Sequence, residues 1–316
     1  MLGDLTQGVV QTTDTGGLPP SMLDAIAEVG GLWHAGDYYA KPEAIVRTAR
    51  EHGVRALRVD ARDLSWIREL PDLEFLHVRT DGRPPLDPVR ELGHLRGLTI
   101  EVGAVRGTVD LGAHPDLRWL KITLSGKGGT ANLPHILAGH PGVEHLRLSE
   151  VPFRDLTELA TTFPSVRFFE VYGADRLKTL GDLGPWRETL RGFGATFALR
   201  LRTLEGIQAL DRIEYVGLTY GTLDQIGVLA RIPSLRYVQL VVTYPSLAPL
   251  AGHTGITMAR VTTPADEDLA PLRSLPSLIA LGGEQWIGRP VPGIPCLEDL
   301  PRDDRLRLEW QRAVNG

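Results

Sequence analysis

The residues of this chain that could carry acid–base chemistry do not form a recognised catalytic motif. The sequence holds nine histidines and a single cysteine, Cys296. It contains no nucleophile elbow, no HExxH zinc motif and no cysteine–histidine pair in a known catalytic arrangement. An acid–base pair could form between Glu170 and His145 or Tyr172 if the fold brings them to one face. These three residues are the candidate catalytic site should the protein be an enzyme.

A glycine-rich stretch, Gly126 to Thr130 (GKGGT), has the composition of a phosphate-binding loop without its spacing. A P-loop needs G-x-x-x-x-G-K-[ST] at the start of a helix, where backbone amides and the lysine hold phosphates. The spacing is wrong here, and no long helical pattern follows. We interpret the stretch as an inserted loop that could contact a ligand at a rim, and no cofactor is expected.

Composition argues against several classes of function. The chain has 316 residues, 42% of them hydrophobic, which is enough for a large core. Its net charge of −5 argues against a nucleic-acid binder, which needs a basic surface. No apolar run approaches the length of a membrane span, and the N-terminus shows no signal-peptide pattern. The single cysteine suits a reducing compartment, so we expect a cytoplasmic protein.

The elements that must position any site come from an internal repeat. The pattern L-x-x-L-x-L, with other apolar residues allowed, recurs with its first positions at Val54, Leu73, Leu95, Leu117, Val143, Val166, Leu190, Ile213, Leu235, Ile256 and Leu278. The copies that start at Leu190, Ile256 and Leu278 are degenerate. Successive copies begin 19, 22, 22, 26, 23, 24, 23, 22, 21 and 22 residues apart. So regular a spacing predicts stacked structural units that share one core.

Each copy predicts one strand followed by a return segment. The last two apolar positions, such as Leu76 and Val78, are two residues apart, which places both side chains on one face of a strand. A proline stands two residues before six of the copies and marks the turn into the strand. Apolar residues at steps of three then follow, as in Leu86-Val89-Leu92, and indicate a short 3-10 or α turn. Stacking such units predicts a parallel sheet.

This pattern resembles the leucine-rich-repeat family, especially its bacterial internalin-like and SDS22-like class, over residues 54–283. The resemblance implies an α/β solenoid, which is a right-handed superhelix with a concave parallel β-sheet and short 3-10 or α turns on the convex side. The family usually places asparagine three residues after the last strand leucine, where it forms a hydrogen-bonded ladder. Here that position holds other residues, for example Asp81, Ser125 and Thr243. We therefore expect other partners for the turn backbone and a less regular solenoid.

The segments that flank the repeats are expected to cap the solenoid, because stacked units expose apolar core at both ends. We assign residues 1–53 to an N-terminal cap, residues 54–283 to the solenoid and residues 284–316 to a C-terminal cap. A helix is predicted over residues 42–52, with proline at its start and Gly53 just past its end. Trp286 or Trp310 is expected to cover the last core layer.

The residues between the inward apolar positions should line the concave face of the sheet. One column along this face is rich in aromatic residues, and its neighbours carry charges of both signs. Aromatic and arginine side chains are enriched at the centres of protein interfaces. We therefore predict that a partner contacts Phe75, Trp119, Lys121, His145, Arg147, Phe168, Glu170, Tyr172, Tyr215 and Tyr237. The alternative is that these rings only stack on neighbouring strands and stabilise the sheet.

Two other recurring side chains have simpler explanations. A run of arginines precedes the aromatic column, and it could form a basic rim or be balanced by nearby glutamates; its members are Arg55, Arg96, Arg118, Arg167, Arg191 and Arg236. His114, His140 and His253 share one repeat position. Strands lie about 4.8 Å apart, and no carboxylate or cysteine recurs there. We expect these histidines to fill turns, and no metal site is predicted.

The sequence predicts a binding module that recognises a protein or peptide through its concave face, as an adaptor, regulator or immunity-type protein. Neither nucleic acid nor a membrane is an expected partner, and a monomer is favoured over an oligomer. The alternative is an enzyme or small-molecule binder of a bacterial biosynthetic pathway with a pocket on the concave face. A third alternative is self-association through an end of the solenoid. The sequence leaves open the identity of the partner, any catalysis and the role of the glycine-rich loop.

Overall fold

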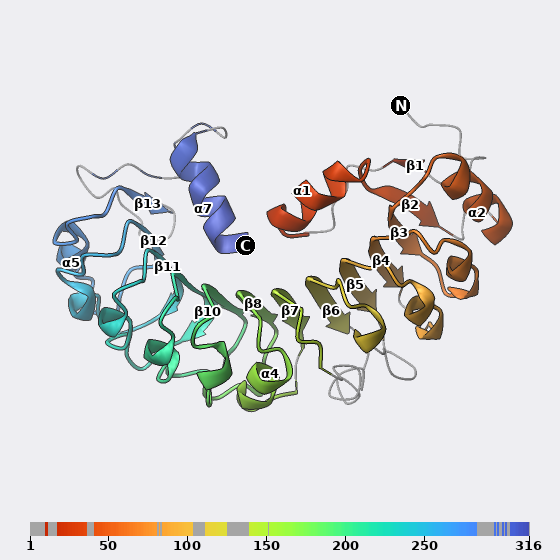
Figure 1. The fold of residues 1–316 in the computed structure, drawn as a ribbon. Coiled ribbons are helices and arrows are strands. Elements are labelled where there is room, and N and C mark those ends of the chain that lie inside the picture. Colours follow the sequence, from red (N-terminus) through yellow and green to blue (C-terminus); the bar gives the residue numbers. More distant parts are fainter. Residues whose placement is uncertain are drawn as a thin grey trace. The chain divides into compact units, whose positions relative to one another are not determined.

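The computed structural model describes residues 10–11, 18–36, 41–80, 82, 84–103, 111–124, 139–150, 152–282, 294, 296, 299, 301 and 304–315. The glycine-rich loop at Gly126–Thr130 and Trp286 lie outside this part of the chain. The chain divides into two compact units, Met1–Glu150 and Val151–Gly316, and each is described by itself. Figure 1 labels the helices and strands of both units.

The first unit is a sheet with short helical segments along one side. Its strands are β1 (Val10–Gln11), β2 (Trp33–Gly36), β3 (Ala56–Asp60), β4 (Phe75–Thr80), β5 (Gly97–Val102), β6 (Trp119–Leu124) and β7 (His145–Ser149). β1 pairs with β2 in antiparallel fashion, and each strand from β2 to β7 is parallel to the next. Two helices, α1 (Pro20–Glu28) and α2 (Pro42–Glu51), precede the repeats, and 3-10 turns lie at Ser65–Glu69, Asp87–Glu91 and Leu111–Ala113. Helix α2 matches the predicted helix over residues 42–52.

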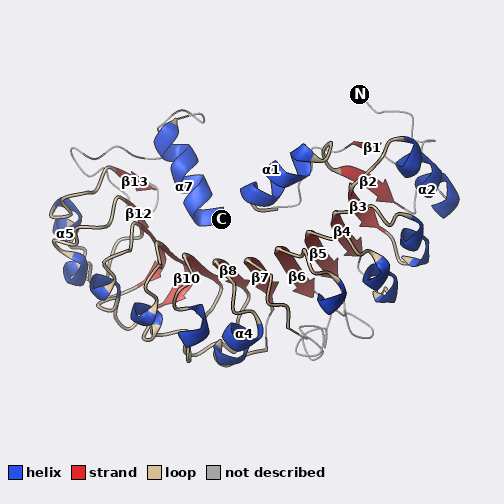
Figure 2. Cartoon of the chain, in the orientation of Figure 1, coloured by secondary structure: helices blue, strands red, loops and turns tan. Residues whose placement is uncertain are grey.

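The second unit repeats the same plan. Its strands are β8 (Phe168–Tyr172), β9 (Gly192–Thr196), β10 (Tyr215–Thr222), β11 (Tyr237–Thr243), β12 (Met258–Val261) and β13 (Ala280–Gly282), each parallel to the next. The helices are α4 (Thr157–Thr162), α5 (Ala270–Arg273) and α7 (Arg305–Asn315), with 3-10 turns at Gly184–Trp186, Ile207–Ala209, Leu229–Arg231 and Ala248–Leu250. In each unit the short return helices lie on the side of the sheet opposite to α1 or α7 (Figure 2).

The strands pair in register, so their inward side chains form continuous rows. In the first unit Leu57, Leu76, Leu98, Leu120 and Leu146 are successive partners, and all are buried. In the second unit the equivalent row contains Phe169, Phe193, Val216, Val238 and Ala259. Each predicted repeat, including the three degenerate copies, supplies one strand. The predicted solenoid of parallel strands with short helical turns is confirmed, and within each unit the inward rows form a continuous core.

Successive coils are joined at the edge where the chain enters the strands. The backbone amide of Arg96 donates to the carbonyl of Glu74 at 2.7 Å, and that of Arg118 donates to the carbonyl of Arg96 at 2.8 Å. The amide of Arg191 donates in the same way to the carbonyl of Arg167 at 2.7 Å. Within each unit, these bonds let a coil satisfy a backbone group of the coil before it at the same repeat position.

Side chains other than asparagine hydrogen-bond to the turn backbone. His114 Nδ1 donates to the carbonyl of Leu92 at 2.9 Å, and His253 Nε2 donates to that of Ile232 at 3.0 Å. The indole of Trp186, which is fully buried, donates to the carbonyl of Phe163 at 2.7 Å. These contacts confirm that the turns use other partners and that the histidines fill turns.

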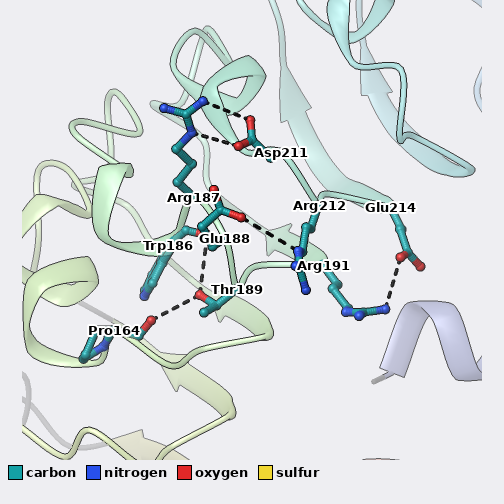
Figure 3. A network of polar contacts seen from close by, with 9 residues as sticks. All are labelled: Pro164, Trp186, Arg187, Glu188, Thr189, Arg191, Asp211, Arg212 and Glu214. Carbon is teal, nitrogen blue, oxygen red and sulfur yellow. Dashed lines mark hydrogen bonds and ion pairs between the residues drawn. The ribbon is translucent and has the colours of Figure 1, made fainter.

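The predicted run of arginines is balanced by acidic residues. In the second unit Arg191 lies 3.3 Å from a carboxylate oxygen of Glu214. Figure 3 shows this pair beside two more ion pairs between neighbouring coils, Arg187–Asp211 at 2.9 Å and Arg212–Glu188 at 3.9 Å. In the first unit Arg55 and Arg96 both pair with Glu74, which is buried. The charges of these arginines are therefore neutralised by carboxylates at this edge of the sheet, which we call the neutralised edge. The contacts do not form a basic rim.

Candidate functional site

The concave face of the first unit is partly covered by helix α1. We expected its aromatic column to be exposed, but Phe75 is only 1% exposed. Its ring lies in an apolar cluster with Met22 and Ile26 of α1, together with Ala56 of the same column. Helix α1 carries apolar residues on one face, and Met22, Ala25 and Ile26 of that face are buried. Helix α1 of the N-terminal segment therefore packs on the concave face, and Phe75 is the buried ring of the sheet that it covers.

Trp119 lies at the border of this covered area. It is half-buried, and its indole nitrogen lies 3.2 Å from Oγ of Ser21, to which it donates a hydrogen bond. On its other side it stacks with the ring of His145, with centroids 5.9 Å apart and planes at 26°. Cross-strand stacking, the simpler explanation for the aromatic column, therefore accounts for part of it.

Charged residues form a second row beside the aromatic column. Nζ of Lys121 lies 2.6 Å from one oxygen of Glu101, and Nε2 of His77 lies 3.3 Å from the other. Burial opposes ionisation of this carboxyl, but the hydrogen bonds from His77 and Lys121 outweigh it and lower the pKa of Glu101 to about 2. Lys121 was predicted to contact a partner, and its ammonium is held by Glu101. Glu101 was not among the predicted site residues, although its repeat position places it on this face.

A similar polar pair stands two strands earlier. His34 Nε2 on β2 lies 3.1 Å from Oδ2 of Asp60 on β3. Burial opposes ionisation of Asp60, while the bond to His34 and the charges of Arg58 and Arg79 outweigh it and lower the pKa of Asp60. Because the contacts join adjacent strands, this polar row stabilises the sheet as well as lining its face.

In the second unit the concave face is paved by rings that lie over glycines. A Cβ atom on Gly192 would come within 2.5 Å of Cδ1 of Phe168, so the ring covers that position of the neighbouring strand. The ring of Tyr215 covers Gly217 on its own strand in the same way. The glycines, which carry no side chain, make room for the two rings. This explains why glycine occurs in columns that elsewhere hold larger residues.

Helix α7 lies against β9, β10 and β11 on this face. The hydroxyl of Tyr237 donates to Oε1 of Glu309 at 2.7 Å, and Trp310 is buried against Met258. The guanidinium of Arg260 stands 5.7 Å from the centre of the Trp310 ring. Burial, reinforced by the bond to Glu309, raises the pKa of Tyr237. Trp310 thus packs on the concave face, whereas Trp286, the other residue expected over the last core layer, lies outside the described residues.

An exposed row of aromatic rings crosses the carboxyl ends of three strands of the second unit. Tyr172 on β8, Phe197 just after β9 and Tyr220 on β10 form this row, which we call the aromatic ladder. The rings of Phe197 and Tyr220 are stacked with centroids 4.4 Å apart, and Tyr172 meets Phe197 edge-on at 5.3 Å. Tyr172 and Tyr220 are 48% and 47% exposed, and Leu199, two residues after Phe197 in the chain, is 54% exposed.

The backbone of the aromatic ladder is strained. Phe197 and Tyr220 have φ of 54° and 58°, in the left-handed region that large side chains rarely adopt. The amide of Phe197 donates to the carbonyl of Thr219 at 2.9 Å, which holds it in this conformation. Strained residues cluster at functional sites, and here Glu150 and Gly173 adopt the same conformation at the same repeat position. Of the ladder, sequence analysis identified only Tyr172, because the left-handed residues break the alternation of a strand.

The three residues proposed for catalysis are divided between the units. His145 belongs to the first unit, whereas Glu170 and Tyr172 lie two residues apart on β8 of the second. Within the described residues, no group of three or more histidine, cysteine, aspartate or glutamate side chains is placed to hold a metal ion. A groove of about 870 Å³ lies on the first unit, but its lining includes Arg55, Glu74 and Arg96 of the neutralised edge and none of the three proposed catalytic residues. No helix in the described part of the chain is long and apolar enough to cross a membrane.

Comparison with solved structures gives several similar folds. TLR13, in a complex with ssRNA13, superposes with a TM-score of 0.54 at 13% identity, covering 78% of this chain and 38% of its own. An internalin from Listeria monocytogenes gives a TM-score of 0.47 at 16% identity, covering 71% of each chain. The leucine-rich repeat domain of APL1B covers 91% of this chain and 72% of its own, with a TM-score of 0.37 at 13% identity. No family model and no curated protein matches the sequence. At these identities the likeness concerns the fold alone.

Proposed function

We propose that this chain, a leucine-rich-repeat solenoid, is a binding module for a protein or peptide partner. The observation that carries the proposal is the exposed aromatic ladder Tyr172–Phe197–Tyr220 on the second unit. The three rings form an aromatic row with two exposed tyrosines, which costs free energy to hydrate, and two of the rings have a left-handed backbone. Burying this surface against a partner would recover that free energy.

The other predicted contact residues differ in how accessible they are. Phe75 and Tyr215 are buried in the free chain, so we propose them as supports of the surface. Trp119, Lys121, His145, Arg147, Phe168, Glu170 and Tyr237 are half-buried, and we propose that they contribute contacts at the edges of the covered areas. Phe168 and Glu170 are on β8, the strand that carries Tyr172 of the aromatic ladder.

A polypeptide partner fits the charge of this chain better than a nucleic acid does. TLR13 forms a complex with ssRNA13, and stacked rings can also hold bases. Single-stranded nucleic acid binding requires a positively charged groove along the backbone. This chain has a net charge of −5, and Arg55, Arg96, Arg118 and Arg191 of its run of arginines pair with glutamates. The aromatic ladder is therefore proposed to receive apolar side chains of a protein.

The experiment compares capture of partners by the wild type and by a double variant, Tyr172→Ser with Tyr220→Ser. Both side chains are exposed, so the variant should fold normally. The matched control is Ile279→Ser, which removes an exposed apolar side chain elsewhere in the second unit. We expect proteins recovered from the native host to fall at least tenfold with the double variant and to be unchanged with the control. Recovery that is equal for all three chains, or that nuclease treatment abolishes, would contradict the proposal.

A further inference from the structure

The seat of helix α7 has the composition of a binding-site centre. It consists of an aromatic hydroxyl, a flexible apolar side chain and a guanidinium, supplied by Tyr237, Met258 and Arg260 on two adjacent strands. Tyrosine and arginine are the residue types, with tryptophan, that dominate binding energy at interfaces. What occupies the seat in the free chain is a pair of consecutive residues of the same chain, Glu309 and Trp310.

The packing of α7 on the sheet centres on Trp310. Of the described side chains of this helix, Trp310 is the buried one, Leu306 is partly buried against the same cluster, and Leu308 is 38% exposed. A helix of 11 residues is marginal in water by itself, so its order depends on its contacts with the sheet. A helix on the surface of the sheet with one fully buried side chain opens more readily than the core strands beneath it.

The aromatic ladder and the α7 seat share strands of one sheet. Tyr220 of the ladder lies on β10, and α7 rests on β9, β10 and β11. A partner that binds at the ladder and extends along the concave face towards β12 therefore meets α7.

We propose that α7 is an internal ligand of its seat, displaced when the partner presents an amphipathic helix with an acidic residue directly followed by an aromatic one. This inference rests on the proposed function and specifies the partner's chemistry. The carboxylate replaces Glu309 as acceptor for the Tyr237 hydroxyl. The aromatic ring replaces Trp310 between Met258 and Arg260. The helix α7 then leaves the concave face.

The test uses a fluorescent synthetic peptide of residues 304–315 (DRLRLEWQRAVN) as the probe, added to the full chain. A seat already occupied by α7 lowers the apparent affinity in proportion to the fraction of chains whose seat is open. The full-length variant Trp310→Ala empties the seat, so it should bind the peptide at least ten times more tightly than the wild type does. A peptide carrying the same substitution should not bind. Equal affinity of both chains, or no binding to either, would overturn the proposal.

Two further chains keep the result interpretable. Glu309→Ala weakens α7 without removing the buried ring, so it should bind the peptide with intermediate affinity even if Trp310→Ala destabilises the unit. Tyr172→Ser/Tyr220→Ser leaves the seat intact and should bind the peptide as the wild type does. A failed ladder experiment with successful peptide binding would thus refute the proposed partner surface alone. A doubled mass for wild type in solution, with α7 exchanged between copies, would overturn the internal-ligand proposal.

Discussion

The hydroxyl of Tyr237 on β11 donates a hydrogen bond to Oε1 of Glu309 on α7 at 2.7 Å. These residues are 72 positions apart in the chain, and their contact places the C-terminal helix on a surface that the repeat pattern alone leaves open. The bond is also charge-assisted, because a carboxylate accepts it.

Removing this hydroxyl should loosen α7 without affecting the sheet. Tyr237→Phe keeps the ring and deletes the donor, which costs about 1 kcal/mol for a partly exposed pair. We expect amide hydrogen exchange in residues 305–315 to accelerate about fivefold, with exchange in β10 and β11 unchanged. Tyr220→Phe, which alters an exposed ring on β10, is the matched control. Unchanged exchange in α7 would show that this bond does not hold the helix.

The carboxylate of Glu101 should make the stability of the first unit depend on pH. Its pKa in the folded chain is lowered from 4.5 to about 2, so ionised Glu101 stabilises the fold above about pH 4.5. This contribution declines as the pH falls from 4.5 towards 2, and amounts to about 2–3 kcal/mol. Urea unfolding of wild type and Glu101→Gln between pH 7 and pH 2 measures it. We expect the difference between the two chains to shrink in acid; a difference independent of pH would contradict the assignment.

Truncation of Phe75 should lower the free energy of unfolding far more than truncation of Tyr172, although sequence analysis predicted both as partner contacts. Phe75→Ala removes a buried ring from beneath α1 and should lower the free energy of unfolding by about 3–5 kcal/mol. Tyr172→Ala removes an exposed ring and should change it by about 0.5 kcal/mol or less. Chemical denaturation of both variants decides this. Comparable losses would show that the aromatic ladder also supports the fold.

Gly192 and Phe168 should show energetic coupling. A methyl group at Gly192 meets the Phe168 ring at 2.5 Å, so Gly192→Ala should destabilise the second unit by about 1–3 kcal/mol. Phe168→Ala vacates that space, and the glycine substitution should then cost at least about 1 kcal/mol less. A double-mutant cycle by urea denaturation measures the coupling. Additive effects would mean that the ring does not lie over the glycine in solution.

The sheet could be predicted from the sequence because each strand is determined by a short local pattern of apolar residues. The apolar alternation within each L-x-x-L-x-L copy is sufficient to predict one strand. The in-register pairing of Leu76 with Leu98 follows from the near-constant spacing of the copies. Even the degenerate copy at Leu190 forms β9, since Phe193 and Ala195 keep the alternation. Neighbouring coils compensate for a weak copy, because the core rows are shared.

The coverage of the concave face could not be predicted, because it depends on contacts between distant parts of the chain. The sequence around Met22 shows an amphipathic segment, but nothing in it specifies that Phe75 is the surface it covers. The sequence likewise offered Trp286 or Trp310 as a covering ring, and nothing local to Trp310 specifies that it packs on Met258. The aromatic ladder was missed for another reason: at Phe197 and Tyr220 positive φ angles turn the side chains away from the direction that strand alternation predicts.

The uniform amide-to-carbonyl links between coils, such as Arg96 to Glu74 and Arg118 to Arg96, make the number of coils adjustable. Each of these coils offers the next the same acceptor carbonyl and donates the same amide to the coil before it, so deleting or duplicating one whole repeat restores the pairing at the junction. Duplication or deletion of a repeat in the gene can therefore lengthen or shorten such a protein in complete steps, and the concave face grows or contracts with it while the remaining coils keep their geometry.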